Sequence, residues 1–166
     1  MTAHPTAGPL AWLGADGGHL RTLAEIWATV DLERSLPEFR TPIVTASAGA
    51  NPDPATIDPR HAAEDALLGA RVLVLTTDDG RRIALAEPSR EGRLAGTLAR
   101  HGEGHIGAYL ESPFGLDVVA TRAATANVRL SRFEIGPFGR SVLVLPGKGS
   151  SRLLILVERP AVPSPA

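Results

Sequence analysis

A tight-turn signal near the middle of the chain restricts the possible folds more than any other feature. Residues 71–77 and 81–87 are rich in aliphatic side chains, and Asp78-Asp79-Gly80 separates them. Because glycine readily adopts the positive φ that such a turn needs, an Asp-Gly pair between two strand-like segments predicts a β-hairpin. The chain therefore contains antiparallel β-structure, and the other elements have to be compatible with it.

Patterns of apolar and polar residues predict the remaining elements. The other predicted strands are 20–30, a weak one at 43–45, 105–111, 129–135, 141–145 and 152–158. The predicted helices are 32–38, one or two turns within 61–67, 90–101 and 115–126. Asp31 and Ser89 are the expected N-terminal caps of the first and third helices. Pro37 is expected to keep the first helix short or irregular.

In chain order these elements repeat one pattern. A strand, a helix and three strands are followed by a linking helix, and then by a strand, a helix and three strands again. Two such βαβββ modules predict an α+β protein whose modules share a curved mixed sheet that encloses a cavity. The expected boundaries are 1–19 for a flexible arm, 20–88 for module 1, 89–103 for the linking helix, 104–159 for module 2 and 160–166 for a disordered tail.

Composition excludes several classes of function. The 166 residues have a formal net charge of −1, so there is no bulk electrostatic attraction to nucleic acid or to an anionic membrane. The absence of cysteine rules out disulfides, thiolate chemistry and cysteine-based metal sites. We find neither a secretory signal pattern nor an apolar run that could span a bilayer, and therefore expect a cytoplasmic protein. A single lysine among 17 basic residues, with abundant Ala, Gly and Pro, indicates a GC-rich bacterial coding sequence.

Three segments carry a resemblance to a known superfamily. Residues 27–33 (Trp-Ala-Thr-Val-Asp-Leu-Glu) look like its opening strand and helix start, and residues 153–158 look like its closing strand. Residues 81–88 followed by 98–106 look like the end of its first module, the linking helix and the start of its second module. The chain thus resembles the vicinal-oxygen-chelate (glyoxalase-like) superfamily, especially methylmalonyl-CoA epimerases and hydroxyphenylpyruvate dioxygenases. The resemblance covers residues 20–159 except for the region around 41–65.

Enzymes of this superfamily usually hold a divalent metal with one residue from each of four strands. Carried over position by position, the four ligands fall on Ala24, Ala84, His105 and Ile155. Only His105 can donate an electron pair to a metal, and one histidine does not supply the three or four protein ligands that a stable catalytic site needs. The resemblance therefore implies a fold that has lost its metal, and we expect no metal and no other cofactor.

Polar and aromatic residues on the predicted strands are the candidate site residues. His105 opens a strand and could act in acid–base catalysis or in ligand binding. Tyr109 lies four residues on and would share its face, where its hydroxyl could orient a ligand. Trp27 could stack on a flat ligand, and Glu25 shares its face, although a one-residue shift would move Glu25 to the opposite face. For each residue a structural role, in the core or at a solvated strand end, remains open.

Two hypotheses for function follow. The first is a metal-independent glyoxalase-like protein of bacterial specialised metabolism. It would bind an oxygenated hydrophobic small molecule such as a polyketide, and could also isomerise or cyclise it with His105 and Glu25 as acid–base residues. Superfamily members without metals include antibiotic-sequestering resistance proteins. The second is a metal-dependent isomerase, lyase or dioxygenase that acts on a carbonyl or acyl-CoA substrate.

The hypotheses differ in the metal they need. If the second one holds, Glu25, Glu87 and Glu158 become the ligand candidates. The expected partner under both hypotheses is a small-molecule ligand, with neither nucleic acid nor membrane. The sequence leaves the oligomeric state open, with a homodimer as one option.

Overall fold

The computed structural model describes residues 9–14, 20–39, 58–77, 79–147 and 151–159. The chain divides into two compact units. One unit comprises residues 24–106, and the other comprises residues 107–166 together with residues 1–23. Among the described residues, no helix is long and apolar enough to cross a membrane.

The unit of residues 24–106 contains a four-stranded mixed sheet. Its elements are β1 (Thr22–Ala28), α1 (Leu32–Ser35), the 3-10 turns η3 (Leu36–Phe39) and η4 (Pro59–His61), β2 (Ala63–Asp65), β3 (Ala70–Thr76), β4 (Arg82–Pro88) and α2 (Arg93–His101). The strands pair in the order β2-β3-β4-β1. The pairs β2–β3 and β3–β4 are antiparallel, whereas β1 runs parallel to β4.

The other unit repeats this topology. Its elements are η1 (Ala11–Leu13), β5 (Gly104–Ser112), α3 (Leu116–Thr125), β6 (Glu134–Gly136), β7 (Gly139–Val144) and β8 (Leu153–Glu158). The strands pair in the order β5-β8-β7-β6, and again the first strand runs parallel to the last while the other pairs are antiparallel. The predicted α+β class with two βαβββ modules is confirmed.

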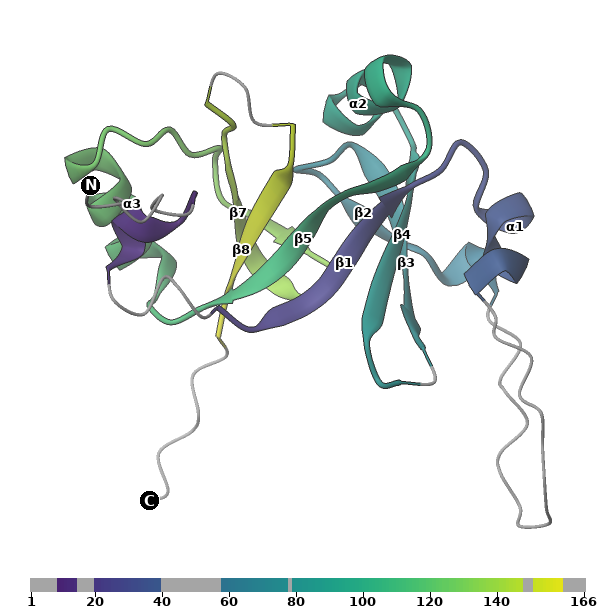
Figure 1. Ribbon diagram of the computed structural model, residues 1–166, viewed down its shortest axis with the longest axis horizontal. Coiled ribbons are helices and arrows are strands. Elements are labelled where there is room, and N and C mark those ends of the chain that lie inside the picture. Colours follow the sequence, from purple (N-terminus) through teal and green to yellow (C-terminus); the bar gives the residue numbers. More distant parts are fainter. Residues whose placement is uncertain (1–8, 15–19, 40–57, 78, 148–150, 160–166) are drawn as a thin grey trace, which may run out of the picture. The chain divides into compact units, whose positions relative to one another are not determined.

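The central hairpin forms where the turn signal placed it. Strands β3 and β4 lie side by side (Figure 1) and pair over their full length. In this register Leu73 is opposite Leu85. The turn closes through the Thr77 N–H, which donates to the Arg81 carbonyl oxygen at 2.8 Å. Gly80 has a φ of 78°, the positive value that its missing side chain allows. Local turn chemistry alone was therefore enough to predict this pairing.

The first helix also follows its sequence signals. The Asp31 carboxylate accepts a hydrogen bond from the Arg34 backbone N–H at 3.0 Å and so caps α1. The α-helical part ends at Ser35, and the chain continues as the 3-10 turn that contains Pro37. Proline cannot donate the backbone hydrogen bond that an α-helix would need at that point, so the predicted short helix is confirmed.

Local patterns were misleading at two places in the unit of residues 24–106. Residues 61–67 were expected to be helical, but residues 63–65 form β2 and pair with the edge of β3. Pairing with an existing strand satisfies more backbone groups than a single helical turn would. Ser89 does not cap α2, because its hydroxyl donates to the Glu64 carboxylate at 3.0 Å and the helix begins only after Gly92. The weak strand predicted at 43–45 lies outside the described residues.

A third difference concerns the predicted strand 129–135. Only Glu134–Gly136 forms a strand, β6, and Leu130 contributes a single antiparallel bridge to Val144. The chain leaves the ladder between the two contacts, so the predicted continuous strand is not formed. The predicted helix 115–126 is present as α3, and its apolar residues Leu116, Val119 and Ala123 are buried.

The N-terminal segment belongs to the core of the second module. Leu10 and Leu13 are buried with residues of β5, α3, β7 and β8 in one apolar cluster. The short turn η1 packs beside α3, as Figure 1 shows near the label N. The Arg122 guanidinium donates to the Leu13 carbonyl oxygen, which fixes the end of this turn. Residues 9–14 are thus part of the folded module.

A largely buried carboxylate forms ion pairs with residues before and after the core of this module. These ion pairs make the stability of the module depend on pH. Glu111 on β5 pairs with Arg159 and, at 3.2 Å, with Arg21, and its side chain is only 10% exposed. The hydrogen bond from Arg159, and secondly that from Arg21, lower the pKa of Glu111. A carboxylate with a lowered pKa contributes stability above its unfolded pKa and loses that contribution as the pH falls.

We therefore expect Glu111→Gln to lower the melting temperature at neutral pH. The difference from the wild-type protein should shrink as the pH falls below about 4.3, the ordinary pKa of glutamate. Added salt should also reduce the difference, because both arginines are largely exposed. Thermal melts between neutral and acidic pH check this, and a difference that does not change with pH would contradict it.

Candidate functional site

Three of the four positions onto which the resemblance carries metal ligands are occupied by buried hydrocarbon side chains. Ala24 on β1 is 1% exposed, and Ala84 on β4 and Ile155 on β8 are fully buried. A hydrocarbon side chain has no electron pair to donate to a metal. These residues therefore do not fit the divalent metal that the fold family implies.

Two of the three glutamates that could replace the missing ligands are engaged elsewhere. Glu87 pairs with Arg71 at 3.0 Å, and Glu158 pairs with Arg140 at 3.3 Å. Glu158 also accepts the Leu116 backbone N–H at 3.0 Å, at the start of α3. Within the described part of the chain, no three His, Asp or Glu side chains come close enough together to hold a metal ion.

The candidate site residues Trp27 and His105 do come together. Trp27 is half-buried near the end of β1, and its ring centre lies 6.0 Å from that of His105, edge to face. Phe39, at the end of η3, packs against Trp27 from another direction, at 5.4 Å. The His105 side chain is exposed. The three rings form an aromatic cluster, which we call the Trp27 cluster.

Trp27 and Phe39 pack against an apolar core formed by β3, β4, α1 and η3. In the sheet, Trp27 pairs with Leu85, and Leu85 pairs with Leu73. Because side chains at paired positions point to the same side of a sheet, these residues share one face. Leu32 and Leu36, from α1 and η3, are buried against them. The cluster thus rests against a packed apolar core.

Within this unit, Trp27 lies on the opposite face of the sheet from Ala24 and Ala84, two of the positions onto which the resemblance carries metal ligands. Along β1, Ala24, Ile26 and Ala28 are buried and alternate with half-buried Glu25 and Trp27. Ala84 pairs with Ile26 and therefore lies on the same face as Ala24. The polar and aromatic side chains of β1 accordingly gather on the face that Ala24 and Ala84 do not share.

The indole N–H of Trp27 is an unusual feature of this cluster. Its nitrogen is shielded from solvent, and among the described residues it has no hydrogen-bond acceptor. A buried donor without a partner costs about 1–3 kcal/mol relative to one that is satisfied. In native proteins, buried donors of this kind normally have a hydrogen-bond partner, either another protein group or an ordered water. An acceptor oxygen placed next to Trp27 would therefore be stabilising.

Glu103 fixes the backbone around the Trp27 cluster, a role that no sequence pattern indicated. Its carboxylate accepts the Val30 backbone N–H at 2.8 Å and the Thr29 hydroxyl at 2.9 Å, and it pairs with Arg34. These bonds, from Val30 first and then from Thr29, lower the pKa of Glu103. Thr29 is buried and also lies 2.6 Å from the Ser35 hydroxyl.

Glu103 thus connects two segments that are distant in sequence. Glu103 stands two residues before His105, and Thr29 stands two residues after Trp27. The hydrogen bond between them therefore holds both rings of the candidate pair in place. From the sequence, Gly102-Glu103-Gly104 indicated only a turn, because a bond to a residue far away in the chain leaves no local pattern.

The other two candidate residues have different surroundings. Glu25 is half-buried on β1, on the same face as Trp27, as the two-residue period predicted. Tyr109 is fully buried on β5 and packs against Phe138, with ring centres 4.9 Å apart. The expected pairing of Tyr109 with His105 on one face of β5 is not tested by these contacts. The role of Tyr109 in ligand binding stays a prediction.

The fold can be compared with that of known proteins. No protein-family model matches the sequence, and no curated protein is similar to it. Among solved structures, methylmalonyl-CoA epimerase from Mycobacterium tuberculosis is 20% identical over 84% of this chain and 88% of that chain, with a TM-score of 0.63. A variant of the epimerase from Streptomyces coelicolor, in complex with 2-nitronate-propionyl-CoA, is 23% identical over 89% and 100%, with a TM-score of 0.63.

A third structure, a hypothetical protein from Bacillus halodurans, is 16% identical over 86% of this chain and 96% of that chain, with a TM-score of 0.62. Identities this low carry information about architecture and not about chemistry. They agree with the two βαβββ modules described above. The chain therefore has the fold of the vicinal-oxygen-chelate superfamily, as the resemblance of its three segments implied.

Proposed function

We propose that the protein binds an oxygenated hydrophobic small molecule at the Trp27 cluster, without a catalytic metal. The observation that carries this proposal is the pairing of an exposed imidazole with an indole N–H that has no acceptor among the described residues. Ligand sites are mostly apolar and have a few polar groups that fix orientation. Trp27 and Phe39 supply the apolar rings, and the imidazole of His105 and the indole N–H supply the polar groups.

The chemistry of the cluster selects a class of ligand. A flat ring can pack edge to face or offset against Trp27 and Phe39, which favours aromatic or polycyclic molecules over flexible chains. A carbonyl or hydroxyl oxygen on that ring would accept the indole hydrogen bond. Polyketides commonly combine flat rings with carbonyl or hydroxyl oxygens. For this reason we propose that the protein acts in bacterial specialised metabolism.

His105 and Glu25 extend the proposal from binding to isomerisation or cyclisation. The imidazole of His105 would remove a proton from a carbon next to the ligand carbonyl, and the electron pair would move onto the carbonyl oxygen as an enolate. Where a carbon–carbon double bond is conjugated with the enolate, the electron pair moves back from oxygen and the proton returns to the far end of the conjugated system, which shifts the double bond, regenerates the imidazole and gives an isomer. This sequence of steps balances protons and electrons without a metal. Glu25, on the same face of β1 as Trp27, is the second proton carrier in this scheme.

The second candidate function is a metal-dependent isomerase that acts on an acyl-CoA. It is favoured by the likeness of the fold to methylmalonyl-CoA epimerases, one of which was solved with an acyl-CoA analogue. The side chains Ala24, Ala84 and Ile155 count against it, because that chemistry needs a metal as a Lewis acid on the carbonyl oxygen.

Tryptophan fluorescence tests the proposed binding. Trp12→Phe leaves Trp27 as the single tryptophan, and a hydroxynaphthoquinone serves as the flat oxygenated probe. We expect the probe to quench Trp27 fluorescence saturably, and His105→Ala to weaken its affinity roughly tenfold to a hundredfold, since a lost hydrogen-bond partner costs about 1–3 kcal/mol. His101→Ala, which removes an exposed histidine at the end of α2, is the matched control and should leave the affinity unchanged.

Two outcomes would count against the proposal. Quenching that stays linear in probe concentration, or an affinity that is the same in both histidine variants with no turnover lost in His105→Ala, would remove the Trp27 cluster as the site. Chelator-sensitive epimerisation of methylmalonyl-CoA by the purified full chain would establish the metal-dependent alternative instead. If turnover of a ligand is found, loss of turnover in His105→Ala with unchanged affinity would assign His105 to catalysis.

A further inference from the structure

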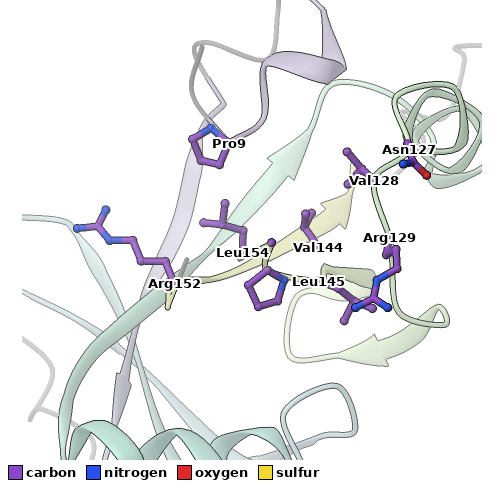
Figure 2. Close-up of a pocket in the computed structure, with 10 residues that line it drawn as sticks. Pro9, Asn127, Val128, Arg129, Val144, Leu145, Arg152 and Leu154 are labelled. Atoms are coloured by element: carbon purple, nitrogen blue, oxygen red, sulfur yellow. The ribbon is translucent and has the colours of Figure 1, made fainter. Parts of the chain in front are cut away.

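A concave site lies in the unit that contains residues 107–166, and none of its lining residues belongs to the Trp27 cluster. It is a groove with a volume of about 510 Å³. Its apolar wall consists of Pro9, Val128, Val144, Leu145 and Leu154. Figure 2 shows these side chains around the ends of β7 and β8, with Arg129 and Arg152 on different sides of them.

Backbone hydrogen bonds hold the walls of this groove in place. The Leu145 N–H donates to the Arg129 carbonyl oxygen at 2.9 Å, so the segment before β6 runs alongside the end of β7. The Val128 N–H donates to the Ala123 carbonyl oxygen at 2.8 Å, and Asn127 has a φ of 55°. The left-handed backbone conformation of Asn127 ends α3, and the residues that follow it line the groove. The concavity is therefore built by the fold and is not a gap between loose side chains.

Two cations stand at the groove without an acidic partner. Within the described parts of the chain, neither Arg129 nor Arg152 forms an ion pair or a side-chain hydrogen bond, and no Asp or Glu lines the groove. Other arginines of the same module are paired: Arg132 with Glu134, and Arg140 with Asp117 and Glu158. The groove thus combines an apolar wall with uncompensated positive charge.

We propose that this groove binds a small amphipathic carboxylate. The hydrocarbon part of the ligand would cover Val128, Val144 and Leu154, which otherwise leave apolar surface in contact with water. The carboxylate would accept hydrogen bonds from a guanidinium, whose planar donors match a carboxylate better than an ammonium group does. A neutral hydrocarbon would leave the charge unmatched, and an inorganic anion would leave the apolar wall uncovered.

The carboxylate site is independent of the function proposed above. It uses different residues and needs no chemistry from His105, and it would serve for binding alone. A carboxylate with a medium-length chain is preferred over a membrane lipid, because the lining is one groove of limited volume that suits a single chain.

Calorimetric titration of the full chain with monomeric decanoate tests the proposal. We expect saturable binding with one decanoate per chain. The double variant Arg129→Ala/Arg152→Ala should weaken the affinity by roughly tenfold or more, as expected for the loss of charge-assisted hydrogen bonds. Arg82→Ala/Arg93→Ala is the matched control. It removes two exposed arginines that also have no ion pair among the described residues but do not line the groove, and it should bind decanoate as the wild-type protein does.

Other ligands distinguish a site for an amphipathic carboxylate from a site for hydrocarbon, for phosphate or for a lipid surface. Decanol should bind at least tenfold more weakly than decanoate if the arginines recognise the carboxylate. Inorganic phosphate should bind more weakly still, because it gains nothing from the apolar wall. Equal affinity for decanol and decanoate, equal affinity in both double variants, or binding to phosphatidylglycerol vesicles that decanoate does not displace would each overturn the proposal. Thermal melts verify that both double variants are folded.

Discussion

Replacing Gly107 by alanine is expected to destabilise the protein by about 3 kcal/mol, at the upper end of the usual cost of overpacking a core. Gly107 is buried in β5, directly opposite Leu153 on β8. A Cβ atom at this position would come within 2.7 Å of the Leu153 carbonyl carbon and 2.9 Å of its backbone nitrogen, and closer still to the carbonyl oxygen. Backbone atoms of a central strand pair cannot move aside without breaking the ladder between β5 and β8.

The measurement is a thermal melt of the Gly107→Ala variant. For a chain of this size, about 3 kcal/mol corresponds to a decrease of the melting temperature by roughly 6–12 °C. Gly147→Ala is the matched control, since a Cβ there would have no atom within 4 Å and should leave the melting temperature nearly unchanged. Equal melting temperatures for the two variants would show that β5 and β8 are further apart than the structure places them.

The fold was predictable because its strongest signals are local. The hairpin of β3 and β4 follows from one Asp-Gly turn, and the start of α1 follows from the Asp31 cap. The buried face of α3 follows from the spacing of Leu116, Val119 and Ala123. Each signal depends on residues within one turn or one strand pair, so no knowledge of tertiary contacts was needed.

Local reasoning was wrong where a distant partner decides the conformation. Residues 63–65 are a strand because β3 offers them an unpaired edge, and Ser89 turns away from α2 because Glu64 lies within hydrogen-bond distance. Neither partner is near in sequence to the group that it attracts. Propensity is a weak prior in such places, and tertiary contacts override it.

The candidate site was predictable only in part, for the same reason. The two-residue period of a strand correctly put Glu25 and Trp27 on one face of β1. It did not indicate Phe39, which reaches Trp27 through the fold of η3, nor Glu103, which binds the turn after β1. The glycine inside β5 was a usable signal, because an isolated glycine in a strand often marks a close approach of another backbone.

The second large effect on stability is expected from replacing Asp65, a buried carboxylate in the turn between β2 and β3. Asp65 is fully buried, and its Oδ1 atom accepts the backbone N–H groups of Leu67 at 2.8 Å and Leu68 at 3.2 Å. The Asp65 carbonyl oxygen accepts the Gly69 N–H at 2.9 Å, so the residue organises the whole turn. Leu67 and Leu68 are themselves buried, so water cannot readily replace the carboxylate as the acceptor.

Asp65→Ala should therefore lower the free energy of unfolding by about 2–4 kcal/mol, since each buried N–H without a partner costs about 1–3 kcal/mol and the two costs overlap. The melting temperature should fall by roughly 5–15 °C. Asp65→Asn retains a carbonyl oxygen at the same position and should lose less than half as much stability, because a neutral acceptor still satisfies the turn. If Asn and Ala at this position destabilise the protein equally, the negative charge and not the acceptor geometry is what the turn requires. If neither variant changes the melt, the turn between β2 and β3 opens independently of the module and contributes little to its stability.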